Sequence, residues 1–243
     1  MLAEPKLSIR VLFVALIGAV TQSCATFTPQ TITCETGGKV AVENFDQRVS
    51  ALGFSVLPPS GGHWCIMSAG DSAVSFRTLP FLGEHVETAP TKEQDAHRFV
   101  VVAVSIKVKT SDITSQPALQ SFMKRWLEVV QGYKIIGGDY YVRWSRDPHW
   151  EVIRSHVEME DSPKADCVRY QLETEQRDAS EFSNWTLTHV NEGIACRHPQ
   201  SERVFVVVQF NEQRRKGYEN PDARRRLRDQ ADVTIRSLEF TAL

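Results

Sequence analysis

The stretch CVRYQLET, residues 167–174, decides the fold because its apolar and polar side chains alternate one by one. This alternation is typical of a β-strand that buries one face and leaves the other in water. A turn-rich segment at 177–183 follows, and the chain then returns through 185–190 toward Cys196. The sequence therefore predicts an antiparallel hairpin here.

The same hairpin brings two cysteines together. If the turn is centred between Glu181 and Phe182, antiparallel register places Cys167 opposite Cys196, which is a natural geometry for a disulfide. A bulge at Gly193 would shift that register by one residue. The pattern therefore predicts proximity of the two cysteines and leaves the bond geometry open.

Other parts of the chain predict further strands. The most hydrophobic run, 99–108, has apolar side chains on both faces at its start, which favours a central strand covered on both sides. Shorter β-prone runs are separated by glycine- and proline-rich turns, which is typical of a meander. The remaining candidates are 54–57, 64–67, 73–79, 140–144 and 204–210, and 150–159 is compatible with a strand or a helix.

Three segments have the spacing of amphipathic helices. Residues 40–52 carry apolar side chains three and four positions apart, Pro117 opens a second helix, and Pro221 introduces a third with an arginine-rich outer face. We expect an α+β fold, in which an antiparallel or mixed sheet packs with about three helices and disulfides staple the structure. Residues 40–243 are expected to form a single domain.

The first thirty residues have the layout of a secretory leader. Lys6 and Arg10 precede an uninterrupted apolar run, 11–20, which polar and small residues follow. About ten apolar residues rise only about 15 Å as a helix, half of the hydrocarbon layer, which disfavours a permanent membrane span. We expect a signal peptide over 1–23 and a flexible tether over 24–39; a buried amino-terminal helix is the alternative.

The segment 20–24, VTQSC, resembles the lipobox of bacterial lipoproteins, whose final cysteine receives diacylglycerol before the leader is removed. The family usually has leucine where this chain has Thr21 and a small residue where it has Gln22. The resemblance implies lipid on Cys24 and, because Ala25 follows, transfer to the outer membrane. Ordinary cleavage after Ala25 is the alternative, and it would leave the protein soluble in the periplasm.

Two further windows, 58–65 and 196–199, resemble a group of small proteobacterial envelope lipoproteins. The likeness implies an envelope lipoprotein. It transfers no functional residue to this chain.

The chain has five cysteines. Lipidation or cleavage removes Cys24 from the thiol pool, and an even set in an oxidising compartment predicts two disulfides. Sequence order suggests Cys34 with Cys65 and Cys167 with Cys196, although four cysteines allow three connectivities. The hairpin gives the second pair independent support.

The chain carries no strong signature of catalysis, cofactor or metal. It has no GxSxG elbow, Walker loop or GxGxxG, and its seven histidines show no metal-ligand spacing. A zinc site at Cys167, Cys196 and His198, or a cysteine nucleophile assisted by His189 or His198, would need free thiolates, which an oxidising compartment disfavours. We therefore expect no cofactor and no metal.

Positive charge is concentrated locally near the C-terminus. The cluster is compatible with contact with an anionic envelope component, while a solvated helix face relieved by nearby carboxylates is the interpretation that general considerations favour. A net charge of -2 and a pI near 6.4 give no reason to expect nucleic acid as a partner. The basic residues are Arg214, Arg215, Lys216, Arg224, Arg225, Arg226 and Arg228.

These observations favour a non-enzymatic binding or scaffolding role. The expected location is the bacterial cell envelope, where the N-terminal lipid contacts the membrane and the domain faces the periplasm. The expected partner is an envelope protein or an anionic envelope component. The alternative is a periplasmic hydrolase whose site is assembled from scattered residues.

Overall fold

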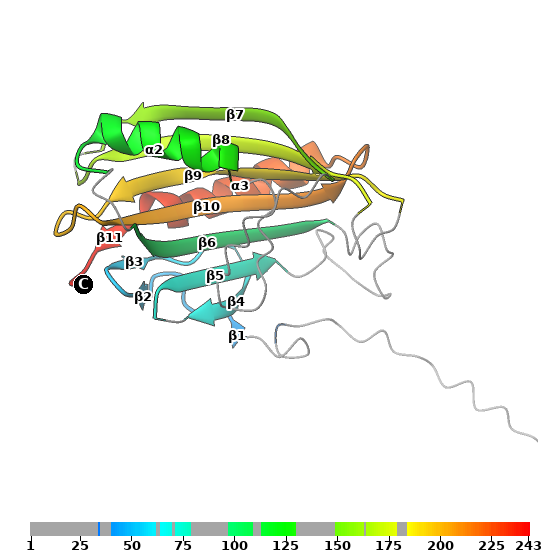
Figure 1. Ribbon diagram of the computed structural model, residues 1–243. Coiled ribbons are helices and arrows are strands. Elements are labelled where there is room, and N and C mark those ends of the chain that lie inside the picture. Colours follow the sequence, from blue (N-terminus) through cyan, green and yellow to red (C-terminus); the bar gives the residue numbers. More distant parts are fainter. Residues whose placement is uncertain are drawn as a thin grey trace, which may run out of the picture.

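An eight-stranded and a three-stranded antiparallel sheet pack with two helices in the part of the chain that the structure describes (Figure 1). The α+β class expected from the sequence is therefore confirmed, and the sheet is antiparallel, not mixed. The expected signal peptide, Cys24, most of the tether and the candidate strand at 140–144 lie outside the described residues. This computed structural model describes residues 34, 40–61, 64–69, 71–78, 97–108, 113–129, 149–162, 164–178 and 184–243.

The large sheet has the order β1-β4-β5-β6-β10-β9-β8-β7. Strand β6 covers the hydrophobic run at 99–108, and it is central and covered on both faces as expected, because β5 and β10 flank it and both of its faces contribute to the core. The ambiguous segment 150–159 is a strand. The strands are β1 (Val40–Ala41), β4 (Trp64–Ala69), β5 (Ala73–Thr78), β6 (Arg98–Lys107), β7 (Trp150–Glu160), β8 (Cys167–Gln176), β9 (Leu187–Arg197) and β10 (Val204–Arg215).

The prediction of a helix over 40–52 is wrong. The chain there forms β1 and then β2 (Val49–Ala51), which turns back into β3 (Phe54–Val56). Gly53 lies in this tight turn at a φ of 82°, a conformation that glycine adopts without steric cost. Strand pairing and burial of β3 therefore outweigh the three-and-four spacing. β11 (Glu239–Phe240) completes the small sheet.

The two helices cover opposite faces of the large sheet (Figure 1). Helix α2 (Gln116–Val129) packs across β7, β8 and β9, and its Leu119 and Met123 share a buried cluster with Phe205. Helix α3 (Pro221–Arg236) packs over β10 and β6, where Leu227 and Phe210 belong to the second cluster. None of the helices in the described ranges is long and apolar enough to cross a membrane.

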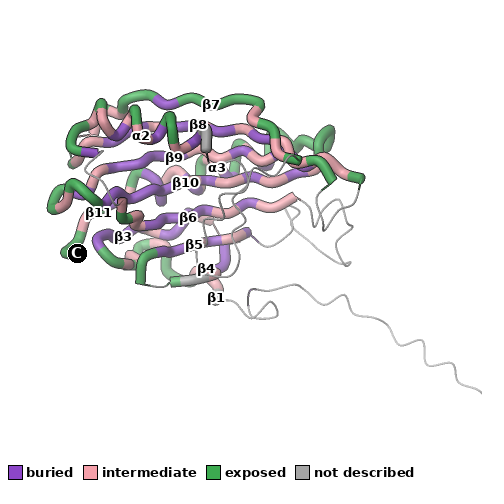
Figure 2. Tube along the Cα trace, in the orientation of Figure 1, coloured by how far each residue is buried: buried purple, intermediate pink, exposed green. Residues whose placement is uncertain are grey.

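Strand β8 confirms the alternation predicted for 167–174. Its buried and half-exposed residues alternate from Val168 to Thr174, and the buried ones lie against α2. On the other face, α3 packs mainly against β10 and β6, and the polar side chains of β8 and most residues of β7 stay partly or fully exposed. Figure 2 shows this gradient as β10 and β9 mostly buried and β7 mostly exposed.

Both disulfides suggested by sequence order are present. Cys34 bonds to Cys65 and Cys167 to Cys196, and all four residues are buried. Cys167 lies directly opposite Cys196 in unbroken β8–β9 register, without the bulge considered at Gly193. Disulfides persist in oxidising compartments, so the pair indicates an extracytoplasmic protein.

A charged groove between the last helix and the sheet

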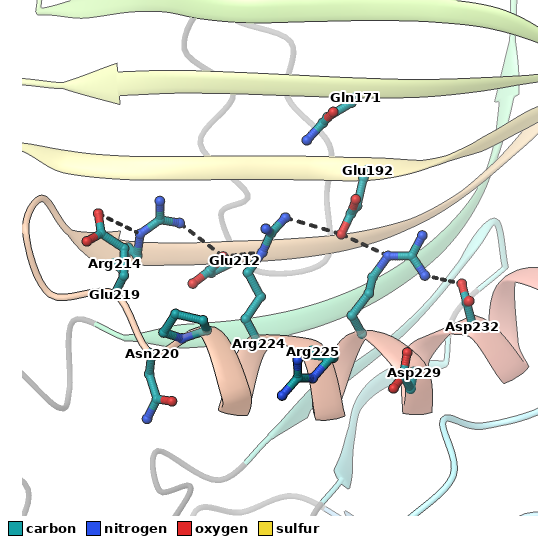
Figure 3. A pocket seen from close by; sticks show the side chains of 12 residues that line it. Gln171, Glu192, Glu212, Arg214, Glu219, Asn220, Arg224, Arg225, Asp229 and Asp232 are labelled. Carbon is teal, nitrogen blue, oxygen red and sulfur yellow. Dashed lines mark hydrogen bonds and ion pairs between the residues drawn. The ribbon is translucent and has the colours of Figure 1, made fainter.

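A pocket of about 560 Å³ lies between α3 and the face of β8–β10 that the helix leaves open (Figure 3). Four arginines and five carboxylates line it, together with Gln171, Asn220 and Pro221. We call this pocket the charged groove. Its charged residues are Glu192, Glu212, Arg214, Glu219, Arg224, Arg225, Arg228, Asp229 and Asp232.

Alternation along β10 builds the floor of the charged groove. The side of β10 that carries buried Val206, Val208 and Phe210 continues, two residues at a time, into Glu212 and Arg214. The strand therefore changes from apolar core to charged floor without changing its face. Both of these charged residues are buried.

The wall comes from the start of α3. Pro221 stands in the first turn, and the side chain of Asn220 accepts a hydrogen bond from the backbone N–H of Ala223, which caps the helix. Arg224 and Arg228 are four residues apart and therefore lie on the same side of the helix. Both reach the sheet.

Glu212 is the centre of the network. Its side chain is only 1% exposed, and three basic groups surround it: His97 Nε2 lies 3.0 Å from Oε1, and Arg214 Nη1 and Arg224 Nε lie 3.0 and 2.9 Å from Oε2. A buried carboxylate is costly unless it is paired. These contacts hold the strand, the helix and His97 together at one point.

A second carboxylate extends the network along the helix (Figure 3). Glu192 on β9 lies 2.8 Å from Arg228 Nε and 3.4 Å from Arg224 Nη2. Arg228 also pairs with Asp232, one turn further along α3. The arginines in the charged groove are thus held in fixed positions by carboxylates on the sheet and on their own helix.

The basic cluster expected from the sequence is divided by the fold. Arg214, Arg224, Arg225 and Arg228 line the charged groove, where the paired carboxylates offset their charge. Elsewhere, Arg215 stacks between Trp185 and Tyr218, with its guanidinium carbon 4.4 and 4.7 Å from the ring centroids. Lys216 pairs with Glu175, and Arg226 is exposed.

The histidines considered for cysteine chemistry have other surroundings. His198 is buried, its Nε2 lies 3.0 Å from the Gly53 carbonyl oxygen, and its Nδ1 accepts a hydrogen bond from the Gln200 backbone N–H. Burial lowers the pKa of His189 to about 4, and its ring lies 4.6 Å from that of Trp150. The four described cysteines are all disulfide-bonded, so neither histidine meets a free thiol.

Sequence reasoning missed Glu212, Glu192, His97 and Gln171. The signal for Glu212 was present, because it continues the period-two face of β10 that was used to predict the strand. Charged residues at alternate positions directly after an apolar face indicate where a strand leaves the core. His97 carries no comparable pattern, since its contact with Glu212 joins positions 115 residues apart.

No protein-family model matches the chain, and no curated protein matches it. Among solved structures, a mutant of the protein Mog1 aligns with 12% identity and a TM-score of 0.40, over 81% of this chain and 96% of that one. LpqN, described as involved in cell envelope biogenesis of Mycobacterium tuberculosis, aligns with 12% identity and a TM-score of 0.38, over 80% and 90%. Likeness at this level is too general to assign a function.

Proposed function

We propose that the chain is a lipid-anchored protein of the bacterial cell envelope that acts by binding, and that the charged groove is its binding site. The two buried disulfides support an extracytoplasmic location. The anchor rests on the lipobox-like segment that ends at Cys24, and the outer membrane as its location rests on Ala25. The ligand we propose is a polar segment of another envelope protein that carries charges of both signs.

The observation that carries this proposal is the near balance of charge in the charged groove. Four arginines and five carboxylates face the same 560 Å³ space. A ligand with charges of one sign would be repelled by about as many groups as would attract it, whereas a segment with both signs finds complementary partners. Because the side chains are already held by one another, little ordering is needed on binding.

The charged groove is poorly suited to hydrolysis. A general acid or base must exchange a proton with the substrate, whereas the carboxylate oxygens of Glu212, Glu192 and Asp232 are already engaged in ion pairs with arginines. The described cysteines are bonded in pairs and offer no nucleophile. These features support binding over the hydrolase alternative.

A photo-cross-linking residue placed at Gln171 in living cells tests the site. Gln171 lines the charged groove from β8, so we expect one discrete adduct whose mass exceeds that of the chain by the mass of a different envelope protein. The same residue at exposed Lys164, in the β7–β8 turn, is the control. Equal labelling at both positions, or no adduct from Gln171, would contradict the proposal.

Charge reversal tests whether the charged groove itself selects the ligand. Arg228→Glu places a carboxylate beside Glu192 and Asp232, and we expect it to abolish the Gln171 adduct. Arg236→Glu is the matched control, because Arg236 lies on the same helix, pairs with the same Asp232 and is 79% exposed. If the adduct survives Arg228→Glu, the charged groove does not select the ligand.

An anionic envelope component is the alternative ligand, and vesicles distinguish it. The full chain carrying Cys24→Ala, which removes the anchor, is mixed with vesicles of phosphatidylglycerol or of phosphatidylcholine. We expect equal and weak retention, because carboxylates offset the arginines of the charged groove. Strong retention on phosphatidylglycerol alone, lost on Arg225→Glu with Arg226→Glu, would favour the anionic component.

A further inference from the structure

Strand β7 is the last strand of the large sheet, and no further strand among the described residues pairs with its outer side. It is 11 residues long, so its outer side offers about 35 Å of backbone edge; the carbonyl oxygens of Val157 and Glu160 on this strand accept hydrogen bonds from the Gln120 and Gln116 side chains of α2. Most of its residues are exposed, as Figure 2 shows. An open edge of this length is a template for another strand.

The side chains of β7 combine apolar surface with charges of both signs. Ile153 and Met159 are 47% and 56% exposed, and they are two of the five large hydrophobic residues exposed in the described part of the chain. Arg154 and Glu158 lie between these two residues on the strand, four positions apart. A bulge between Val152 and Arg154 interrupts the inner pairing, and the strand is regular from there to its end.

We propose that two copies of this chain pair through their β7 edges, antiparallel, around a twofold axis at His156. In that arrangement residue 154 faces 158 and residue 155 faces 157, because each pair is centred on 156. Arg154 then meets Glu158 of the other copy twice, and Met159 lies near the end of the paired segment, toward the bulged Ile153 of the other copy. The charges of the edge are thus matched, as an interface between identical surfaces requires.

The neighbouring register is less favourable. If the axis lay at Val157, Arg154 would face Glu160, which Arg169 already contacts at 2.8 Å with two nitrogens, whereas Glu158 makes a longer, exposed contact of 3.3 Å with His156. Met159 would face Ser155, so its apolar surface would stay in water. The centre at His156 therefore satisfies more groups on the edge.

The pairing would join the open faces of the two copies. His156 lies beside Gln171 of β8 in the strand register, and Gln171 lies beside Glu192 of β9. A twofold axis perpendicular to the sheet keeps these faces on the same side. The two charged grooves would then open onto one continuous polar floor with a copy of α3 at each side.

A single cysteine at the axis tests the dimer. His156→Cys in the full chain, in the envelope of intact cells, brings two identical positions within disulfide distance, since directly opposite Cβ atoms lie about 5 Å apart. We expect a product of twice the chain mass on a non-reducing gel. In the control Lys164→Cys, the two cysteines lie about 50 Å apart in the same dimer, and we expect no such product.

Charge exchange tests the register. Arg154→Glu, added to His156→Cys, places like charges opposite each other and should reduce the cross-linked product by about tenfold or more. Arg154→Glu together with Glu158→Arg restores opposite charges only if the axis lies at His156, and we expect the product to return. Equal cross-linking at positions 156 and 164, no product at 156, or no recovery in the double exchange would overturn the proposal.

The outcome is separable from that of the proposed function. The adduct expected at Gln171 contains a different protein, whereas a dimer contains this chain alone. A failed cross-link at position 156 therefore does not contradict the proposal that the charged groove is a binding site. In the same way, the loss of the Gln171 adduct does not contradict the proposed dimer.

Discussion

Arg224 on α3 and Glu212 on β10 meet with Nε and Oε2 2.9 Å apart, where the helix begins to cross the sheet. The Glu212 side chain is almost completely buried, and it also contacts His97 and Arg214. The pair links α3, which covers the core, to the charged groove, where we propose that a ligand binds. The same carboxylate therefore supports both the stability of the fold and the binding site that we propose.

Glu212→Gln should destabilise the protein by about 3 kcal/mol. The substitution keeps the shape but removes the buried charge that Arg214 and Arg224 share, and leaves them with the longer contacts to Glu219 and Glu192 at 3.8 and 3.4 Å; breaking a buried pair costs about this much in other proteins. Urea denaturation in parallel with the wild type measures the change. Glu219→Gln is the control, because Glu219 is 55% exposed and 3.8 Å from Arg214, so its loss should cost less than about 1 kcal/mol.

His189 should make stability fall with acid. Burial lowers its pKa from 6.5 to about 4, so the folded state resists a proton that the unfolded chain accepts. The contribution is complete above pH 6.5 and is lost as the pH falls through 4, by about 3 kcal/mol in total. Unfolding curves between pH 7 and 4 measure it. His189→Gln should flatten this part of the profile, and an unchanged slope would show that other groups cause it.

Gly193→Ala should destabilise the sheet without disturbing the hairpin register. A Cβ at this position would lie 2.1 Å from the Val208 carbonyl oxygen and 2.7 Å from the Gln209 Cα, so the backbone of β10 must move. Overpacking of this kind costs about 2–3 kcal/mol. Thermal unfolding gives the value. Gly217→Ala offers a contrast, because Gly217 has open space around it but a φ of 86°, so its cost comes from backbone strain alone.

The hairpin was predictable because two local signals agreed. Period-two alternation fixed β8, and the spacing of Cys167 and Cys196 about the turn gave the register that the structure has. The prediction of a helix over 40–52 failed because the apolar spacing suits two short strands equally well, β1 paired with β4 and β2 paired with β3. Periodicity in a short window does not separate these outcomes when tertiary pairing decides.

The charged groove was predictable only in part. The basic cluster was visible in the sequence. Its partners Glu192 and Glu212, however, lie on two strands, 32 and 12 residues before Arg224. Which carboxylates meet which arginines depends on how α3 returns across the sheet. A single sequence carries no signal for that contact.

The state of the cysteines in the exported chain tests the central claim, an extracytoplasmic envelope location, most directly. Cells grown with labelled palmitate are fractionated, and the protein is denatured with a maleimide before its intact mass is measured. We predict an envelope chain that begins at Cys24, carries the lipid label and has no thiol for the maleimide, with Cys24→Ala losing the label. A cytosolic chain that keeps residues 1–23 and reacts at all five cysteines would contradict the account.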